Sequence, residues 1–483
     1  MTNTITAMIH AAAERNPAAV AVIHQGKIIN YQQLLLLLGA AAKFLHEQGI
    51  KPGDVVGLTM DRTPLHLIVM LALGQLGACS IPLSLSLTAV MRTRLAAKYG
   101  LRAIVTDRAE AAVTNVPTVL VERIDVGQGS TPWTLDGYKP KPETPFRVNL
   151  TSGTTGEPKG ILFSHEFLIQ RIDKALEGFS GDERLIVPDL HIGVGSVLSL
   201  GVLSRGGAVI FTGSNHLRDT ISAVQLHAAT RLILSPWAAR QLLALLPSKG
   251  LVFPLLRELR LVGAAPGERL LRELLQRVTP HIQSRYAMTE LGILTATTPE
   301  SLLANPACAG YLRPGVKAEA VESNDRPLPR GTRGQLRFAI PSMPEGYFCD
   351  ETISREKFRG GWFYSGDIGH INAESQLFIE GRVDDLLNVG GHKILPQNIE
   401  EVLTAHEEVN EAVAFLIKGP DGENILVAAV IPHSTRIASD LQAYCRKKLG
   451  LYTPEKFFIM REFPRTASGK IIRSEISRLA QAP

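Results

Sequence analysis

Residues 149–162 read NLTSGTTGEPKGIL, a run of hydroxyls, glycines, one proline and one lysine between two apolar ends. Ser, Thr, Gly and Pro over several residues are typical of a surface loop. However, Gly153, Gly156 and Gly160 allow a positive φ, so successive N–H groups can converge on an anion. The stretch is not a Walker A loop, because no Gly-Lys-[Ser/Thr] follows at the required spacing. It is therefore either a linker or a cradle for phosphate, and its neighbours decide between the two.

The surrounding residues 50–290 alternate between two patterns. Short runs rich in β-branched residues predict strands, and longer runs with helical spacing lie between several of them. The strand runs are DVVGLTM, RAIVTD, FRVNL, AVIFT, RLILS and LRLVG; the helical runs are PLHLIVMLALGQL, HLRDTISAVQLHAA, PWAARQLLALL and GERLLRELLQRV. This alternation predicts an α/β chain with parallel sheets covered by helices. Ligands of such sheets bind beyond the carboxyl ends of strands, and the loop at Thr151 follows FRVNL directly, which favours the phosphate cradle.

The pattern changes in the last third of the chain. From about residue 315 to 379, the runs VKAEAV, GQLRFAI, GWFYSGD and QLFIEGR predict an antiparallel sheet or small barrel. After GRVDD a new αβ unit begins, with the helices LPQNIEEVLTAH and IASDLQAYCRKKL and the strands VNEAVAFLI and ILVAAVIP. We therefore predict a large N-terminal domain over 1–383, made of parallel αβ-layered sheets plus a small antiparallel β-subdomain. A small α+β domain follows over 384–483.

Composition narrows the function classes. The net charge of +5 is mild for 483 residues, and no basic run exceeds RKK at 446–448, so nothing indicates a nucleic-acid partner. The four cysteines form no CxxC pair, which argues against a zinc site and a disulfide scaffold. The N-terminus does not read as a signal peptide, and a cytoplasmic location is expected. The apolar stretch 192–211 contains Arg205 and a Gly-Gly break, so we predict a buried helix followed by a strand and no membrane span.

The loop TSGTTGEPKG at 151–160 resembles the phosphate loop of the adenylate-forming enzymes, which include acyl- and aryl-CoA synthetases, adenylation domains of peptide synthetases, and luciferases. Further matches follow in the order of that family: GAAP at 263–266, YAMTE at 286–290, YSGD at 364–367, GRVDD at 381–385 and PRTASGKIIR at 464–473. Ala287 and Ser365 are modest departures, since neither removes a catalytic group. The resemblance spans nearly the whole chain.

The resemblance implies a reaction in two halves. A carboxylate attacks the α-phosphorus of ATP, which expels pyrophosphate and leaves an acyl-adenylate. A thiol then attacks the activated carbonyl and releases AMP. Negative charge builds up at the phosphoryl oxygens in the first half, so catalysis consists mostly of positioning and cationic stabilisation. ATP and Mg²⁺ are the implied cofactors, and the thiol belongs to CoA or to the phosphopantetheine of a carrier protein.

The family motifs also imply individual roles. Lys470 would bridge the acid and the α-phosphate, Thr289 would donate a hydroxyl to that phosphate, and Glu290 would hold Mg²⁺. Each of these residues taken alone is more often an ordinary surface or core residue, so their joint order carries the assignment. The implied nucleotide contacts are Thr151, Ser152, Gly153, Thr154, Thr155, Gly156 and Lys159 for phosphate, Gly263, Ala264, Ala265, Pro266, Tyr286, Ala287 and Met288 for adenine and its surroundings, and Asp367 and Arg382 for ribose.

Two further features concern the thioester half of the reaction. Asp384 resembles the hinge residue of the family, which would make the C-terminal domain mobile between adenylation and thioester formation. Gly390 and Gly391 would then leave room for a pantetheine arm in a thiol tunnel. As local sequence, the same two glycines read equally well as an ordinary turn between strands.

The segment from Val187 to Gly207 resembles the start of the acid pocket, with Pro188 and His191 in the pattern of acyl- and aryl-activating relatives. Amino-acid-activating relatives place an aspartate near the position of Val194. An ammonium buried beside valine would be costly, so we predict an acid without an α-amino group, with Asp189 five residues away as the alternative partner. Gly193 leaves room near the helix. Trp237 is assigned to the pocket wall, and a core position is the alternative.

The leading hypothesis is an acid–thiol ligase that makes an acyl- or aryl-CoA through an adenylate from a small-molecule carboxylic acid. No carrier domain follows Lys470, so the acceptor is expected to be CoA or a separate acyl carrier protein. The competing hypothesis of another class is a catalytically silent protein that binds nucleotide or acid, and a luciferase-like oxygenase is a third. A monomer and a homodimer are equally compatible with the sequence.

Overall fold

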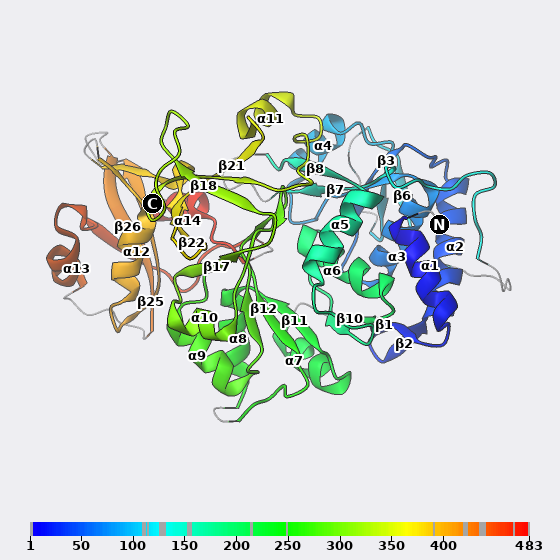
Figure 1. The fold of residues 1–483 in the computed structure, drawn as a ribbon, viewed down its shortest axis with the longest axis horizontal. Helices are drawn as coiled ribbons and strands as arrows, with labels where there is room; N and C mark the ends of the chain where they lie inside the picture. Colours follow the sequence, from blue (N-terminus) through cyan, green and yellow to red (C-terminus); the bar gives the residue numbers. More distant parts are fainter. Residues whose placement is uncertain are drawn as a thin grey trace. The chain divides into compact units, whose positions relative to one another are not determined.

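The structure is a computed structural model and describes residues 3–108, 113, 115–124, 132–151, 157–212, 216–247, 250–389, 392–418, 424–433, 441–466 and 469–481. The chain forms two compact units (Figure 1). Unit 1 comprises residues 1–306, 313–315 and 340–358, and unit 2 comprises residues 307–312, 316–339 and 359–483. The chain therefore passes between the units more than once, and the boundary at residues 383–384 stays a prediction.

Unit 1 contains two mixed sheets. One has the strand order β13-β12-β11-β9-β10-β1-β2 and the other β6-β5-β3-β4-β7-β8. All neighbours are parallel except the edge pairs β1–β2 and β7–β8. The strands are β1 (Val20–His24), β2 (Lys27–Asn30), β3 (Val55–Thr59), β4 (Cys79–Pro82), β5 (Ala103–Thr106), β6 (Thr118–Leu120), β7 (Pro145–Leu150), β8 (Gly160–Ser164), β9 (Arg184–Ile186), β10 (Ala208–Phe211), β11 (Arg231–Leu234), β12 (Glu258–Leu261) and β13 (Ile282–Ser284).

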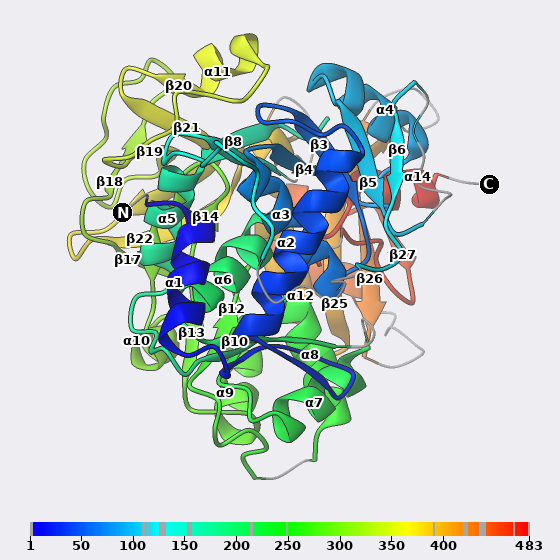
Figure 2. The same cartoon turned by 90° about the vertical axis from the view of Figure 1, so that its right-hand side faces the viewer.

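Helices lie between and around these sheets. α5 packs against β8 and α6 against β10, so this helix pair separates the two sheets (Figure 1), while α1, α2 and α3 pack together (Figure 2). The helices of unit 1 are α1 (Ile5–Arg15), α2 (Tyr31–Glu47), α3 (Pro64–Leu76), α4 (Ala89–Lys98), α5 (His165–Ala175), α6 (Gly193–Ser204), α7 (Leu217–Leu226), α8 (Pro236–Leu245), α9 (Glu268–Arg277), α10 (Pro299–Ala304) and α11 (Glu351–Lys357). Short strands β14 (Ala287–Met288), β15 (Gly292–Ile293) and β16 (Thr295–Ala296) complete the unit.

The helix termini follow from local sequence. Asn30 and Gln33 form a capping box at the start of α2. α3 begins with Pro64 in its first turn, and its last residue Leu76 is followed by the C-cap residue Gly77, whose φ of 75° is left-handed. α3 and α6 are apolar on nearly all sides, because each is enclosed by other elements of unit 1. The predicted buried helix and strand within residues 192–211 are confirmed as α6 and β10.

Unit 2 holds the predicted antiparallel sheet, in the order β17-β22-β21-β19-β18. A second sheet has the order β25-β26-β27, and β23 pairs with β24. The elements are β17 (Cys308–Leu312), β18 (Lys317–Val321), β19 (Gly334–Ala339), β21 (Trp362–Ile371), β22 (Gln376–Arg382), η2 (Val383–Asp385), β23 (Leu387–Val389), β24 (His392–Ile394), α12 (Pro396–Thr404), β25 (Val409–Lys418), β26 (Asn424–Pro432), α13 (Leu441–Leu449), η3 (Gly450–Tyr452), β27 (Lys456–Ile459) and α14 (Arg473–Ala480), with β20 (Phe358–Arg359) at the boundary of the units.

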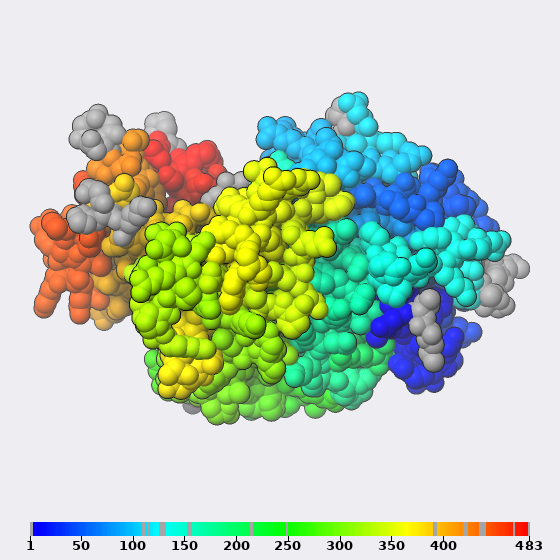
Figure 3. All heavy atoms as spheres, turned by 45° about the horizontal axis from the view of Figure 1, so that its top comes forward, coloured from blue at the N-terminus to red at the C-terminus, as the bar shows by residue number. Residues whose placement is uncertain are grey.

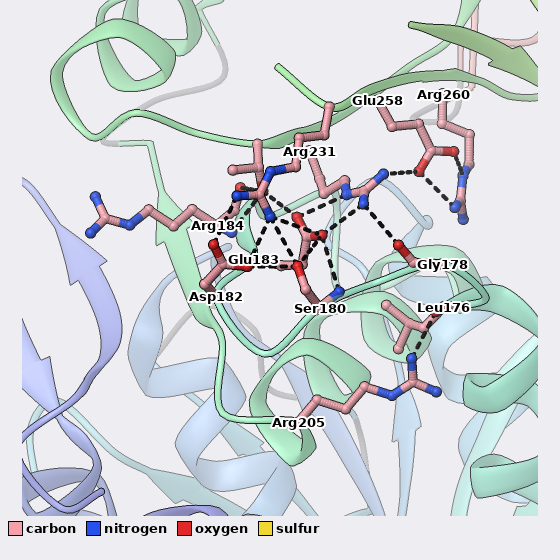
Figure 4. A network of polar contacts seen from close by, with 12 residues as sticks. Leu176, Gly178, Ser180, Asp182, Glu183, Arg184, Arg205, Arg231, Glu258 and Arg260 are labelled. Carbon is pink, nitrogen blue, oxygen red and sulfur yellow. Dashed lines mark hydrogen bonds and ion pairs between the residues drawn. The ribbon is translucent and has the colours of Figure 1, made fainter. Parts of the chain in front are cut away.

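A buried ion-pair network ties together the amino ends of three strands of unit 1 (Figure 4). Arg231 binds both oxygens of Glu183, at 2.7 and 2.9 Å, and reaches Glu258 Oε2 at 3.1 Å. Arg260 donates two further hydrogen bonds to Glu258, at 2.7 and 3.0 Å. Glu183, Glu258 and Arg260 are each at most 3% exposed, so the network is a desolvated charge cluster.

Within the described ranges, no helix is long and apolar enough to span a membrane. The fold prediction is confirmed: the chain is α/β, with large layered sheets, an antiparallel sheet and a C-terminal α+β region. One detail was not predicted. The loop after β7 returns through the antiparallel strand β8 rather than through a helix, so the glycine-rich stretch connects a hairpin.

Candidate active site

Two of the motif segments meet at one edge of a parallel sheet. β12 and β13 are parallel neighbours with Leu261 opposite Ser284, so both strands reach the same edge at their carboxyl ends. Segment 263–266 follows β12, and segment 286–290 follows β13. Gly263 has a φ of 96°, a conformation that favours glycine, and residues 263–265 are exposed. The sheet topology therefore brings these two predicted nucleotide segments together.

Residues 286–290 are held in a hairpin. Ala287 and Met288 form β14, which pairs with Ile293 and Gly292 of β15, and Thr289 lies in the turn region that follows β14. The main chain of this turn is fixed by Arg171 of α5, which donates from Nη2 to Glu290 O at 2.7 Å and from Nη1 to Leu291 O. Burial lowers the pKa of Arg171, and the nearby Glu290 carboxylate partly opposes this shift.

The Glu290 side chain is only 9% exposed. Its Oε1 accepts a hydrogen bond of 2.7 Å from the hydroxyl of Tyr347. The ring of Tyr347 lies 5.6 Å from Lys159 Nζ, at the end of the glycine-rich loop. A single fixed carboxylate fits Mg²⁺, which proteins often hold through one or two carboxylates while substrate phosphates and water fill the remaining positions.

Hydrogen bonds and ion pairs hold the described ends of the glycine-rich loop in place. Thr151 N donates to Lys159 O at 2.8 Å and closes the loop, while Ser152, Gly153, Thr154, Thr155 and Gly156 lie outside the described residues. Phe348 N donates to Gly160 O at 2.8 Å. Lys98 Nζ contacts Asp350 at 2.9 Å and Glu157 at 3.5 Å. The segment 347–350 therefore holds the described end of the loop in place. Helix α11, which has no buried residue, follows this segment at the surface (Figure 3).

The predicted acid-pocket residues lie at the start of α6. Asp189 Oδ1 accepts hydrogen bonds from His191 N at 2.9 Å and His191 Nδ1 at 2.8 Å. Burial alone would raise the pKa of Asp189, but the bonds from His191 outweigh it and lower the pKa to about 2. Gly193 and Val194 are half-buried in the first turn of the helix. Trp237, at the start of α8, is 37% exposed, so the core alternative is wrong for this side chain.

The remaining predicted residues lie in unit 2. Arg382 Nη1 donates to Asp367 Oδ1 at 2.9 Å, and Asp367 is 7% exposed, so the two predicted ribose contacts are paired with each other. Asp384 lies in η2. Lys470 is exposed, and its main chain is held by Thr466, whose N donates to Lys470 O at 2.8 Å. Gly390 and Gly391 lie outside the described residues.

Sequence reasoning missed two residues that position this site, Arg171 and Tyr347. Arg171 donates to the main-chain carbonyls of Glu290 and Leu291, about 120 residues later in the chain. Tyr347 donates to the side chain of Glu290, 57 residues earlier in the chain. No local pattern encodes such contacts. The available signals were weak: an arginine on the buried face of an amphipathic helix, and an aromatic residue in the turn-rich sequence GYF.

Comparison with known proteins identifies the family. The family model described as AMP-binding enzyme matches residues 9–348, and that of the AMP-binding enzyme C-terminal domain matches residues 398–470. The chain is similar to a fatty acid–acyl-carrier-protein ligase of Streptomyces coeruleorubidus, at 28% identity over 96% of this chain and 94% of the relative. It is also similar to a feruloyl-CoA synthase of Amycolatopsis, at 26% identity over 96% and 97%.

Among solved structures, O-succinylbenzoate coenzyme A synthetase of Bacillus subtilis in complex with AMP shares the fold, with a TM-score of 0.85 at 22% identity over 99% of this chain and 98% of the other. Fold and motif-bearing segments together define an adenylate-forming enzyme of the acyl- and aryl-CoA synthetase type. The chain belongs to the AMP-binding enzyme family.

Proposed function

We propose that this chain activates a carboxylic acid without an α-amino group, using ATP, and transfers the acyl group from the adenylate to the thiol of CoA. The observation that carries the proposal is the edge where segments 263–266 and 286–290 follow two parallel neighbouring strands. Membership of the AMP-binding enzyme family supports it, as do the relatives named as acid–thiol ligases. A cytoplasmic location and a monomeric or homodimeric state remain parts of this proposal.

In the first half-reaction, unit 1 supplies the phosphate-binding groups. The loop from Thr151 to Lys159 binds the β- and γ-phosphates, and Thr289 donates to the α-phosphate. Glu290 holds Mg²⁺, which when bound neutralises charge on the phosphate oxygens. The hydrogen bond from Tyr347 holds one oxygen of Glu290 in a fixed direction, which would orient the carboxylate for the metal.

Unit 2 supplies the remaining groups. Asp367 accepts hydrogen bonds from the ribose hydroxyls, and Arg382 contacts the same sugar. Lys470 contacts the acid and the α-phosphate during adenylation, which stabilises the charge that develops there. Asp384 is the hinge around which residues 384–483 move before the thiol attacks, and Gly390 and Gly391 leave space for the pantetheine arm.

The class of acid follows from the start of α6. Val194 stands where an amino-acid substrate would need a carboxylate, and the nearby Asp189 is already engaged by two hydrogen bonds from His191. A substrate ammonium would therefore be desolvated there without a free acidic partner. His191 and Gly193 line the acid pocket, and Trp237 forms its wall.

A pyrophosphate-release screen over aryl, short-chain and long-chain acids, with amino acids as the contrast, tests the proposal. We expect release with at least one acid and none with amino acids. Absence of release with every acid would favour a silent nucleotide- or acid-binding protein, and oxygen uptake with an acyl-adenylate would indicate the luciferase-like alternative.

The second candidate acceptor is a carrier protein, because one of the similar proteins is a fatty acid–acyl-carrier-protein ligase. CoA and a holo-carrier offered side by side to preformed acyl-AMP separate the two acceptors. Faster loading of the carrier would replace CoA in the proposal and leave the adenylation half unchanged.

A further inference from the structure

Arg147 in β7 is a buried cation that has no carboxylate hydrogen-bond partner among the described residues. The residue is 1% exposed, and its three hydrogen bonds all go to neutral acceptors: Asn149 Oδ1 at 3.2 Å, Leu190 O at 2.7 Å and Met70 Sδ at 3.1 Å. A thioether sulfur is a weak acceptor. Buried charges in proteins are usually paired, as Arg260 is paired with Glu258 in the same unit. A bound anion would therefore stabilise the buried guanidinium of Arg147.

Asp189 is the carboxylate that acts electrostatically on Arg147, but it is not a hydrogen-bonded counter-ion of Arg147. Asp189 favours the charged form of Arg147, but its Oδ1 is engaged by the main-chain N and the ring Nδ1 of His191. Asp189 acts in the same way on a second guanidinium, that of Arg62. The Asp189 carboxylate is thus not reserved for Arg147, because its Oδ1 is taken up by His191 and its charge also acts on Arg62.

A further donor beside Arg147 has no partner in the described part of the chain. Because Asn149 accepts from Arg147 through Oδ1, its Nδ2 is the opposite end of the amide, and this atom is buried and unpartnered. Asn149 is 1% exposed. His191 Nε2 is also buried and unpartnered among the described residues, but it is the acceptor nitrogen of the neutral ring, because Nδ1 donates to Asp189. Leaving a buried amide donor unsatisfied beside a buried guanidinium is costly, so Arg147 and Asn149 together point to a ligand with acceptor oxygens.

The absence of a side chain at Gly193 leaves room beside Asn149. A Cβ placed on Gly193 would lie 3.8 Å from Asn149 Oδ1, and apart from its own helix and chain neighbours it would meet no described atom outside Asn149 within 4 Å. Gly193 is half-buried and is the first residue of α6, whose N-cap residue Ile192 supplies no side-chain hydrogen bond. The helix start therefore adds positive potential on the same side. An anion could approach past His191 and Gly193 toward the buried groups behind them.

We propose that the acid activated by this chain carries a second carboxylate, which Arg147 and Asn149 hold. This inference rests on the proposed function and names its substrate class, a dicarboxylic acid. The reacting carboxylate is an unsuitable partner for Arg147, because adenylation converts it into the uncharged acyl end of a mixed anhydride, whose remaining negative charge lies on the phosphate, and the buried guanidinium would lose its counter-ion. A second carboxylate keeps its charge through both half-reactions and so binds the ground state and transition state alike.

Matched pairs of acids test the proposal through pyrophosphate release by the full chain. The pairs are butyrate with succinate, hexanoate with adipate, and benzoate with terephthalate. We expect kcat/KM for the better dicarboxylic acid to exceed that of its matched partner by at least about thirtyfold, the scale for one buried charge pair. Arg147→Met should abolish that ratio. A preference for monocarboxylic or hydroxylated acids, or an equal loss on both members of a pair, would overturn the proposal.

A second variant decides the question even if Arg147→Met fails to fold. Asn149→Asp would give Arg147 an internal carboxylate, so it should raise the melting temperature of the free protein and remove the preference for dicarboxylic acids. Retention of the preference would contradict the inference. Arg260→Met is the matched control: it deletes another fully buried arginine of unit 1, so it should lower the melting temperature without changing the acid ratio.

The outcomes also separate this inference from the proposed function. Release of pyrophosphate with monocarboxylic acids alone would refute the second carboxylate and leave acid activation standing. Absence of release with every acid, together with unchanged nucleotide binding, would refute the proposed function itself.

Discussion

Arg231→Met should destabilise unit 1 substantially, because it removes the centre of the buried network shown in Figure 4. The substitution deletes a bidentate contact with Glu183, at 2.7 and 2.9 Å, and the 3.1 Å contact with Glu258. Removing one partner of a buried ion pair costs about 3–5 kcal/mol, since the remaining charge stays desolvated.

The structure places the cost near the lower end of that range. Glu258 keeps both hydrogen bonds from Arg260. Glu183 keeps a hydrogen bond from Thr230 Oγ1, one of 3.3 Å from Ser180 N and a 3.6 Å contact with the half-exposed Arg257. We therefore expect about 3 kcal/mol, which at roughly 2 °C per kcal/mol for a large domain corresponds to a fall of about 6 °C in the melting temperature.

Thermal unfolding at a fixed scan rate, followed by circular dichroism, measures this change. The control is Arg269→Met, which removes an exposed ion pair with Glu273 and should shift the melting temperature by about 1 °C or less. Adding Glu183→Gln to Arg231→Met should restore part of the loss, because the buried charge is then gone. A melting temperature of Arg231→Met equal to that of the control would refute the reasoning.

Three further predictions concern catalysis and pH. Lys470→Ala should slow pyrophosphate release by about a hundredfold or more while sparing thioester formation from supplied acyl-AMP, and equal loss in both assays would contradict its role. Asp384→Pro should show the reverse pattern, because proline fixes φ at the proposed hinge; a variant normal in both half-reactions would argue against a hinge there. Burial alone would raise the pKa of Glu258, but the guanidiniums of Arg260, Arg285 and Arg231 together outweigh it and hold the pKa below its usual 4.5. This contribution to stability is present above pH 4.5 and is lost as the pH falls through the folded-state pKa, so acid unfolding monitored by fluorescence should be less steep in Glu258→Gln.

The fold was largely predictable because the local sequence of most helices and strands carries recognisable start, end and periodicity signals. The run PLHLIVMLALGQL became α3 with the same bounds, since proline at its start and glycine after its end are strong terminal signals. The order of strands and helices also predicted which strand ends carry the motif segments. The antiparallel return through β8 was not predictable from alternation, because a two-strand hairpin and a strand followed by a helix begin with the same pattern.

The site was predictable only where the chemistry resides in short motifs. The contacts of Arg171 and Tyr347 join residues far apart along the chain, and such pairings depend on tertiary packing. Arg147 did carry a local signal that sequence reasoning left unused: a charged residue inside FRVNL, a strand expected to be buried. His66 is the corresponding signal within the otherwise apolar α3.

The path of the chain between the two units has a consequence for synthesis on the ribosome. Residues 340–358 belong to unit 1, yet they are made only after strands β18 and β19 of unit 2. Glu290 therefore precedes its partner Tyr347 by 57 residues, a delay of roughly 3–11 s at ordinary translation rates. During that interval the nascent unit 1 holds a carboxylate without its tyrosine hydroxyl and a loop without the segment that fastens its base. The larger unit is thus completed late, and a nascent chain released before residue 347 would lack the contact that orients its acidic side chain.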